Sequence, residues 1–210
     1  MTLRYEILPV TPFRQNCTLI WDDESGEAVL TDVGGDVPFL LQALANRKLT
    51  LTAIWLTHGH LDHAGGVVEM LETHKVPVLG PHREDEFLLQ SLPQTTAQYG
   101  FPVSPAFAPN RWLEEGETLT VGRYAFQVLH IPGHTPGHVV FYCAEAELLI
   151  AGDVLFYETI GRTDFPRGNH ADLINNIRNK LFAFPETVQV VAGHGRMTSI
   201  GHEKRHNPFF

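Results

Sequence analysis

Three histidines and one aspartate fall within six residues, directly after an apolar run that is typical of a buried strand. The run is residues 51–56, and the four polar side chains are His58, His60, Asp62 and His63. In extended chain a two-residue spacing places His58 and His60 on one side, so that Asp62 and His63 can face a second position. Neutral imidazole and carboxylate are the usual ligands of zinc and of other first-row cations. The segment therefore predicts a metal site at the end of a strand, in preference to a turn that carries surface histidines.

Three more side chains of the same kind stand in the same place relative to an apolar run. His134 follows residues 124–131, Asp153 follows residues 148–151, and His194 follows residues 188–192, and each of the three lies next to a glycine. Strand ends hold side chains rigidly while the loops beyond them stay open to a ligand, and glycine permits a sharp turn beside a crowded centre. One histidine at a strand end is usually a core or surface group, but four such strand ends, counting His58, favour a common site.

The remaining pattern predicts a mixture of strands and helices in two similar halves. We expect strands at residues 3–8, 17–21, 28–33, 51–57 and 76–79, with helices at 36–47, capped by Asp36, at 64–74 and at 83–91. A connection rich in proline and glycine follows at 92–110. Beyond it we expect strands at 119–121, 124–131, 139–143, 148–151 and 188–192 and a helix at 171–182. This order suggests helices packed outside a core of paired sheets, within one domain of residues 1–210.

Composition excludes several classes of partner. The formal net charge of −9 argues against nucleic acid, because phosphate binding depends on a basic surface. No run approaches the length of a membrane span, and the first ten residues do not resemble a signal peptide. The two cysteines, Cys17 and Cys143, form neither a disulfide framework nor a thiolate site, which agrees with a reducing, cytoplasmic compartment. The sequence leaves the oligomeric state open.

The spaced set of seven residues resembles the complete ligand set of the metallo-β-lactamase fold superfamily. It is similar in detail to the compact, single-domain glyoxalase II-like branch, the hydroxyacylglutathione hydrolases, and the resemblance extends over nearly the whole chain. The segments that support the resemblance are residues 57–60, 132–138, 152–156 and 193–195. The resemblance implies an α/β fold, a four-layer αββα sandwich with metals at one edge of the two sheets. It further implies that one metal is bound by His58, His60 and His134, that the other is bound by Asp62, His63 and His194, and that Asp153 bridges them.

The chemistry that this ligand set implies is hydrolysis. A bound divalent ion lowers the pKa of water from near 16 to about 7, so hydroxide becomes available at neutral pH. We expect it to attack the carbonyl of a glutathione thioester such as S-lactoylglutathione, giving a 2-hydroxy acid and glutathione. Asp62 could also accept a proton, and Asp153 contributes as the bridge. The ligand set accepts one or two divalent cations, for which zinc is the first candidate and iron or manganese the alternatives.

Other polar residues are candidates for supporting roles. Asp32 stands at a strand end and could orient a ligand imidazole, or could be a solvated turn aspartate. Arg162 and Asp164 belong to segment 161–168, which resembles a loop that supports the site in short glyoxalase II-like hydrolases. Long glyoxalase II enzymes carry a C-terminal helical extension that contacts glutathione, whereas this chain stops soon after His194. Lys204 and Arg205 could meet the glutathione carboxylates instead, or belong to a solvated tail.

Three alternatives to thioester hydrolysis remain open. Persulfide dioxygenases resemble the chain in the Gly-Arg-Thr-Asp-Phe segment and use a single iron, which here would be bound by His58, His134 and Asp153. The presence of Asp62, His63 and His194 favours a two-metal hydrolase. Lactone or β-lactam hydrolysis would use the same nucleophile. The metals could also serve only to stabilise a non-catalytic interaction module, although structural zinc sites usually close with four protein ligands.

Overall fold

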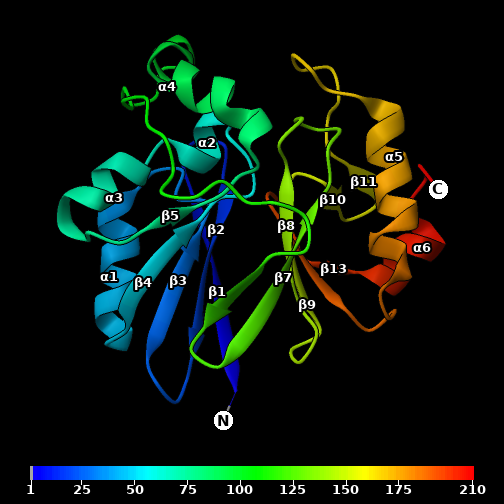
Figure 1. Cartoon of the computed structure of the whole chain (residues 1–210), viewed down its shortest axis with the longest axis horizontal. Coiled ribbons are helices and arrows are strands. Elements are labelled where there is room, and N and C mark those ends of the chain that lie inside the picture. Colours follow the sequence, from blue (N-terminus) through cyan, green and yellow to red (C-terminus); the bar gives the residue numbers. More distant parts are fainter. Residues whose placement is uncertain (1) are drawn as a thin grey trace.

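Two β-sheets face each other in the computed structural model, which describes residues 2–210 (Figure 1). The first sheet has the order β1-β2-β3-β4-β5, in which β1, β2 and β3 pair antiparallel and β3, β4 and β5 pair parallel. Its strands are β1 (Leu3–Val10), β2 (Gln15–Asp22), β3 (Glu27–Thr31), β4 (Thr50–Trp55) and β5 (Val78–Leu79). The strands expected in this half are confirmed, with β5 shorter than predicted.

The second sheet has the order β13-β12-β9-β8-β7-β6 and comes from the C-terminal half. Its strands are β6 (Thr118–Val121), β7 (Tyr124–His130), β8 (Val139–Cys143), β9 (Leu148–Gly152), β12 (Gln189–Ala192) and β13 (Thr198–Ser199). A separate pair, β10 (Leu155–Phe156) with β11 (Thr159–Ile160), follows β9. The pair β10–β11 and strand β13 were not predicted, because two-residue strands carry no detectable periodicity.

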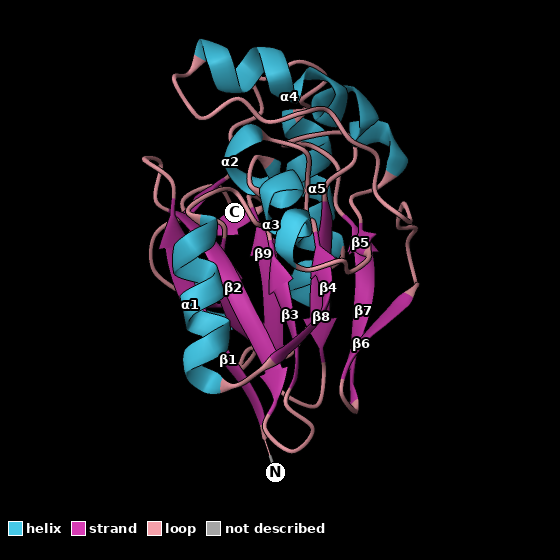
Figure 2. Cartoon of the chain, turned by 90° about the vertical axis from the view of Figure 1, so that its left-hand side faces the viewer, coloured by secondary structure: helices cyan, strands magenta, loops and turns pink. Residues whose placement is uncertain are grey.

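Helices cover the outer faces of both sheets. Figure 1 shows α1 and α3 outside the first sheet and α5 and α6 outside the second. Figure 1 and Figure 2 both show α2 and α4 above the upper edge of the first sheet. The helices are α1 (Val37–Arg47), α2 (Leu61–Ala64), α3 (Val67–Thr73), α4 (Glu86–Gln98), α5 (His170–Asn179) and α6 (Ile200–His206), with short 3₁₀ turns η1 (Arg83–Asp85) and η2 (Leu181–Ala183). The expected four-layer αββα sandwich is confirmed.

Three separate apolar cores fill the spaces between the four layers. Side chains alternate along each strand, so Ile54 enters the core under α1 and α3 while the next residue, Trp55, enters the core between the sheets. Trp55 packs there against Phe126 and Phe141 of the second sheet, with ring centroids 5.2 and 5.3 Å apart. The third core lies between the second sheet and α5. The inner core therefore fixes the two sheets against each other, and with them the strand ends that carry the predicted ligands.

Two predicted helices differ from the structure. The helix expected at 64–74 begins later, as α3 at Val67, and Ala64 instead ends the separate turn α2. Gly66, between the two, packs against the backbone of Gly35, where a Cβ would lie 2.8 Å from the Gly35 nitrogen. The helix expected at 83–91 continues as α4 through Pro93 to Gln98, so the irregular connection starts later than predicted. Hydroxyl groups in α4 donate to carbonyls of the preceding turn, as Thr96 does to Leu92 at 2.6 Å.

Asp36 stands before α1 but does not cap it. It adopts a left-handed conformation with φ of 50°, and its carboxylate accepts a hydrogen bond from the Thr11 backbone N–H at 2.7 Å instead. The predicted cap was therefore wrong. Among the described helices, none is long and apolar enough to cross a membrane.

Candidate metal centre

The first group of inward-facing nitrogen atoms belongs to His58, His60 and His134. His58 and His60 follow β4 in extended chain, and His134 follows β7. The Nδ1 atom of His60 lies 3.1 Å from Nε2 of His58 and 3.0 Å from Nε2 of His134. The three imidazoles thus converge on one place although residues 58 and 134 are far apart in the chain, and their ligand atoms are near enough to hold one cation.

The second group consists of Asp62, His63 and His194. Asp62 and His63 lie on the single turn of α2, while His194 follows β12 of the other sheet. The Oδ2 atom of Asp62 is 3.2 Å from Nε2 of His194 and 3.8 Å from Nε2 of His63. These three ligand atoms could hold a second cation.

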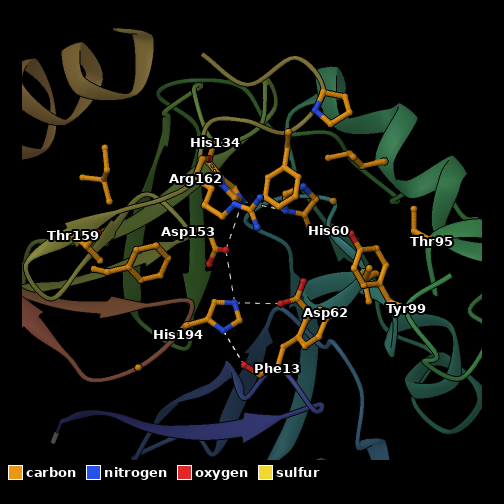
Figure 3. Close-up of a pocket in the computed structure, with 18 of the residues that line it drawn as sticks. Phe13, His60, Asp62, Thr95, Tyr99, His134, Asp153, Thr159, Arg162 and His194 are labelled. Carbon is orange, nitrogen blue, oxygen red and sulfur yellow. Dashed lines mark hydrogen bonds and ion pairs between the residues drawn. The ribbon is translucent and has the colours of Figure 1, made fainter. Parts of the chain in front are cut away.

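Asp153 stands between the two groups. It follows β9, and its Oδ1 lies 3.4 Å from Nε2 of His63, whereas its Oδ2 lies 3.5 Å from Nε2 of His134 and 3.7 Å from Nε2 of His194 (Figure 3). One carboxylate therefore faces both histidine groups. This is the geometry expected for the bridging ligand of a two-metal site.

The outward nitrogen of each of four imidazoles is held by an oxygen. Nδ1 of His134 donates to the carbonyl of Arg162 at 2.7 Å, and Nδ1 of His194 faces the carbonyl of Phe13 at 3.2 Å. Nδ1 of His63 lies 3.1 Å from Oδ2 of Asp32, and Nδ1 of His58 lies 3.0 Å from the Thr57 hydroxyl. Because a carbonyl oxygen can only accept, the proton of His134 and His194 is on Nδ1, which leaves Nε2 free as a ligand.

Two buried atoms in the centre lack a hydrogen-bond partner among the described residues. They are Nε2 of His63 and Oδ1 of Asp153, which face each other. Gly193 leaves the necessary room, because a Cβ at this position would lie 2.1 Å from Oδ1 of Asp153. Buried polar atoms are normally satisfied. A positive ion between imidazole and carboxylate would satisfy both, so these residues fit a divalent cation.

Burial keeps most of the imidazoles neutral. It lowers the pKa of His60 to about 3, with a further decrease from the neighbouring charge of His134, and it lowers the pKa of His58 well below the usual value. The pKa of His134 is lowered too, because the effect of burial exceeds the attraction of Asp153. A neutral imidazole has a free lone pair, so three ligands are ready to bind a cation at neutral pH.

The carboxylates stay ionised despite burial. Burial raises the pKa of Asp153, but the charge and hydrogen bond of His63, together with the attraction of His194, outweigh that effect and lower it. Burial also raises the pKa of Asp62, but the attraction of His63 and His194 outweighs that effect and lowers it. In return, Asp153 and Asp62 raise the pKa of His63 against the effect of its burial. A proton and a cation therefore compete for the position beside His63.

Asp32 lies where a residue that orients ligands is expected. Its carboxylate accepts from the backbone N–H and the hydroxyl of Thr57, both at 2.7 Å, and from His63. Thr57 in turn contacts His58. A single buried carboxylate is thus connected to one imidazole in each group.

Among the described residues, the side chains of the other predicted supporting residues make no hydrogen bond to a candidate metal ligand, although Arg162 lines the cavity above the centre. The Arg162 side chain is exposed, pairs with Asp164 at 2.8 Å and lies over the Phe165 ring, while its backbone carbonyl holds His134. Lys204 and Arg205 belong to α6, where Arg205 pairs with Glu186. Neither of these two is among the described residues that line the cavity above the centre.

Three residues in the structure were not among the predicted site residues. Asp85 is fully buried and accepts from the N–H of Gly59 at 3.0 Å, the N–H of Gly137 at 2.6 Å and the hydroxyl of Thr135 at 2.8 Å. It joins the loop of His58 to that of His134. His138 accepts from the Asp153 N–H at 3.0 Å and stacks on His58. Asn16 binds the His194 loop. His138 could have been suspected from its motif, but a lone Asp85 or Asn16 carries no sequence pattern.

A large cavity opens over the centre. Its volume is about 1090 Å³, and His60, Asp62, His134, Asp153 and His194 form part of its floor (Figure 3). Most other lining side chains are aromatic or aliphatic. Such a cavity is at the upper end of the roughly 300–1,000 Å³ that enclose drug-sized ligands.

Comparison with known proteins identifies the family. The metallo-beta-lactamase superfamily profile matches residues 10–194. The chain therefore belongs to the metallo-beta-lactamase superfamily. The hydroxyacylglutathione hydrolase GloC of Haemophilus influenzae is 46% identical over 208 residues, which cover 99% of this chain and 98% of GloC. As a member of this superfamily with a His/Asp cluster in the expected place, the chain is a metal-dependent hydrolase that binds divalent metal.

Solved structures of the superfamily agree over almost the full length. The BLEG-1 B3 metallo-beta-lactamase has a TM-score of 0.90 at 38% identity, covering 98% of this chain and 99% of BLEG-1. TTHA1623, in a di-iron-bound form, has a TM-score of 0.89 at 35% identity, covering 98% of this chain and 100% of TTHA1623. ETHE1 from Myxococcus xanthus has a TM-score of 0.78 at 31% identity, covering 99% of this chain and 84% of ETHE1.

Proposed function

We propose that the protein hydrolyses glutathione thioesters of 2-hydroxy acids, of which S-lactoylglutathione is the simplest candidate. The observation that carries the proposal is the position of Asp153 between two complete groups of inward-facing ligand atoms. The similarity to GloC over nearly the whole chain supports glutathione thioesters as the substrate class. His58, His60 and His134 would hold one cation, Asp62, His63 and His194 the second, and Asp153 would bridge them.

Bound cations would supply a water of lowered pKa and would polarise the thioester carbonyl. Zinc is the first candidate, and iron is the alternative that the similarity to di-iron TTHA1623 supports. In hydrolysis a C–O bond forms, the C–S bond breaks, and the electron pair of that bond leaves with sulfur. The products are a carboxylate, a thiol and one proton.

Residues of the chain would control the proton and the position of the substrate. The Asp62 carboxylate lines the cavity and is held by His194, so it can orient the attacking water and accept its proton. Asp32 and the carbonyls of Phe13 and Arg162 keep the ligand imidazoles in one tautomer and one orientation. The apolar walls of the cavity limit competing water.

Persulfide dioxygenase activity is the second candidate. The similarity to ETHE1, a persulfide dioxygenase, supports it. It would use one iron held by His58, His134 and Asp153. The second group of ligand atoms around Asp62 favours the hydrolase.

The experiment compares the two reactions on the same protein, loaded with zinc or with iron. Loss of the ultraviolet absorbance of the thioester in S-lactoylglutathione measures hydrolysis, and an oxygen electrode measures oxygen uptake with glutathione persulfide. We expect hydrolysis that chelation abolishes and metal restores. Oxygen uptake without thioester cleavage would overturn the proposal.

A further inference from the structure

Helix α4 has a second face that lies outside the core and lines the cavity. Leu89, Leu92 and Thr96 point into the protein and are fully buried. Another stripe of the same helix lines the cavity and consists of Phe87, Leu88, Ser91, Thr95 and Gln98. Phe87 and Leu88 are only half-buried. None of these five side chains is charged, although the Arg167 guanidinium lies 4.2 Å from the centroid of the Phe87 ring. The face starts beside the metal centre, because Leu88 packs against Gly59 of the ligand loop.

Two exposed aromatic side chains extend this face. Phe13, at the tip of the β1–β2 hairpin, is 45% exposed, and Tyr99, just after α4, is 54% exposed, which makes both unusually open for large apolar groups. Their ring centroids are 6.1 Å apart, and both line the cavity. Figure 3 shows Thr95 and Tyr99 to the right of the metal ligands and Phe13 below Asp62. We call the stripe of α4 together with Phe13 and Tyr99 the α4 wall.

The opposite wall of the cavity is different in charge. It is formed by β10, β11 and the loop after His194, and Figure 3 shows Thr159 on this side. The cation of this wall is Arg196, whose guanidinium carbon lies 3.2 Å from the centroid of the Tyr157 ring. A thioester whose carbonyl is at the metal centre must place its two halves in different directions. Arg162 also lines the cavity, but its guanidinium is already paired with Asp164 at 2.8 Å. The carboxylates of the thiol half therefore match Arg196, which leaves the α4 wall, with no charged side chain of its own, for the acyl half.

We propose that the α4 wall is an acyl subsite, and that the enzyme prefers 2-hydroxyacyl groups with a large apolar or aromatic side chain. This inference rests on the proposed thioester hydrolysis and names its substrate class. The reaction is unchanged: water adds to the carbonyl carbon, the C–S bond breaks, and the apolar 2-hydroxy acid, the thiol and a proton leave. A lactoyl group, with its single methyl, would leave most of the α4 wall uncovered.

The test measures binding, apart from turnover. S-methyl-, S-butyl- and S-hexylglutathione are thioethers, so they cannot be hydrolysed, and their alkyl groups replace the acyl half. A methylene that leaves water completely gains about 0.8 kcal/mol, and contact with one wall provides roughly half of that. We therefore expect the Kd for the zinc-loaded protein, measured by calorimetry, to fall about twofold per methylene, or about 30-fold from S-methyl to S-hexyl.

Two variants with the same substitution on opposite walls locate the subsite. Thr95→Trp fills the α4 wall, and Thr159→Trp fills the wall of β11. We expect Thr95→Trp to reduce the ratio of the S-methyl to the S-hexyl Kd at least tenfold, and Thr159→Trp to leave that ratio as in the native protein. Circular dichroism and thermal melting identify a variant that does not fold, and Ser91→Trp then replaces Thr95→Trp.

Equal affinity for all three thioethers would overturn the inference, and so would a ratio that falls only in Thr159→Trp. Hydrolysis of S-lactoylglutathione is measured separately on the same samples. If affinity rises with alkyl chain length but S-lactoylglutathione is not hydrolysed, the subsite is supported and the proposed function is wrong. If S-lactoylglutathione is hydrolysed but affinity does not rise with chain length, the proposed function is supported and the subsite is wrong.

Discussion

The side-chain amide of Asn16 donates a hydrogen bond to the carbonyl oxygen of Gly195 at 2.9 Å, and thereby joins the first strand pair to the loop that carries His194. The same amide donates to the carbonyl of Ala192, also at 2.9 Å, and the backbone N–H of Asn16 donates to Gly193 at 2.7 Å. The position of His194, a proposed metal ligand from the second half, is thus determined partly by a residue of the first.

Asn16→Ala should weaken this connection. It removes two hydrogen bonds and takes this donor from the carbonyl of buried Ala192 and from that of Gly195, so we expect the free energy of unfolding to fall by about 2–3 kcal/mol and the affinity for the second cation to decrease. Urea unfolding and metal titration measure both. Thr18→Val, on the same strand, is the control, because the Thr18 hydroxyl makes only a long bond of 3.5 Å. Equal stability of the two variants would contradict the connecting role.

Asp32→Asn should reduce metal affinity without loss of a ligand. An amide cannot accept all three of the hydrogen bonds that Asp32 accepts from Thr57 and His63, so the imidazole loses its fixed tautomer. Residues behind metal ligands typically change affinity 10- to 100-fold. Competition with a chromophoric chelator measures the effect. Asp22→Asn is the control. Asp22 also accepts from backbone N–H groups, but it is the last residue of β2, and neither of these groups belongs to a candidate metal ligand. Equal metal affinity of the two variants would show that Asp32 does not support metal binding.

Asp85 should make the free energy of unfolding decrease as pH rises, which is opposite to the usual effect of a carboxylate. Burial raises its pKa to about 6, although hydrogen bonds from Thr135, Gly137 and Gly59 oppose the increase. The folded protein therefore holds a proton on Asp85 that the unfolded chain has released between about pH 4 and 6, and the contribution of this group to stability falls as pH rises through 6.

Asp85→Asn removes that dependence. We expect the difference in unfolding free energy, native minus variant, to decrease by about 1–3 kcal/mol between pH 4 and 7, as measured by urea unfolding at a series of pH values. Because both proteins share every other titrating group, the difference isolates Asp85. Parallel pH curves would rule out the raised pKa.

Arg162→Ala should leave the metal content unchanged. The contact with His134 is made by the backbone carbonyl of Arg162, which the substitution keeps. The side chains of Arg162 and Asp164 are both 67% exposed, so their ion pair contributes at most about 1 kcal/mol. Metal analysis and thermal melting check both expectations. A variant that loses a cation would show that the guanidinium is needed at the site.

The sequence indicated the ligands because each of them carries its own chemistry at a recognisable strand end. His58, His134, Asp153 and His194 follow apolar runs that become strands, and the alternating pattern of those strands separates the cores on either side of each sheet. The resemblance supplied the grouping of the candidate ligands, which stays a prediction, and the ligand atoms of each proposed group lie near enough to hold one cation.

Other features had no such pattern. The oxygens that hold His134 and His194 are backbone carbonyls, and the residue type that carries a carbonyl does not indicate what it binds. Asp85 depends on three donors that are distant in the chain, and α4 continues through a proline that usually ends a helix. Tertiary contacts decided each of these cases, so local sequence could not predict them.

The central claim is that both halves of the chain together bind two cations through Asp153. Metal content by plasma mass spectrometry, after saturation with zinc and removal of free metal, tests it most directly. We expect about two equivalents per chain in the native protein and at most one in Asp153→Ala, with circular dichroism to verify folding. Two equivalents retained by Asp153→Ala, or none bound by the native protein, would contradict the account.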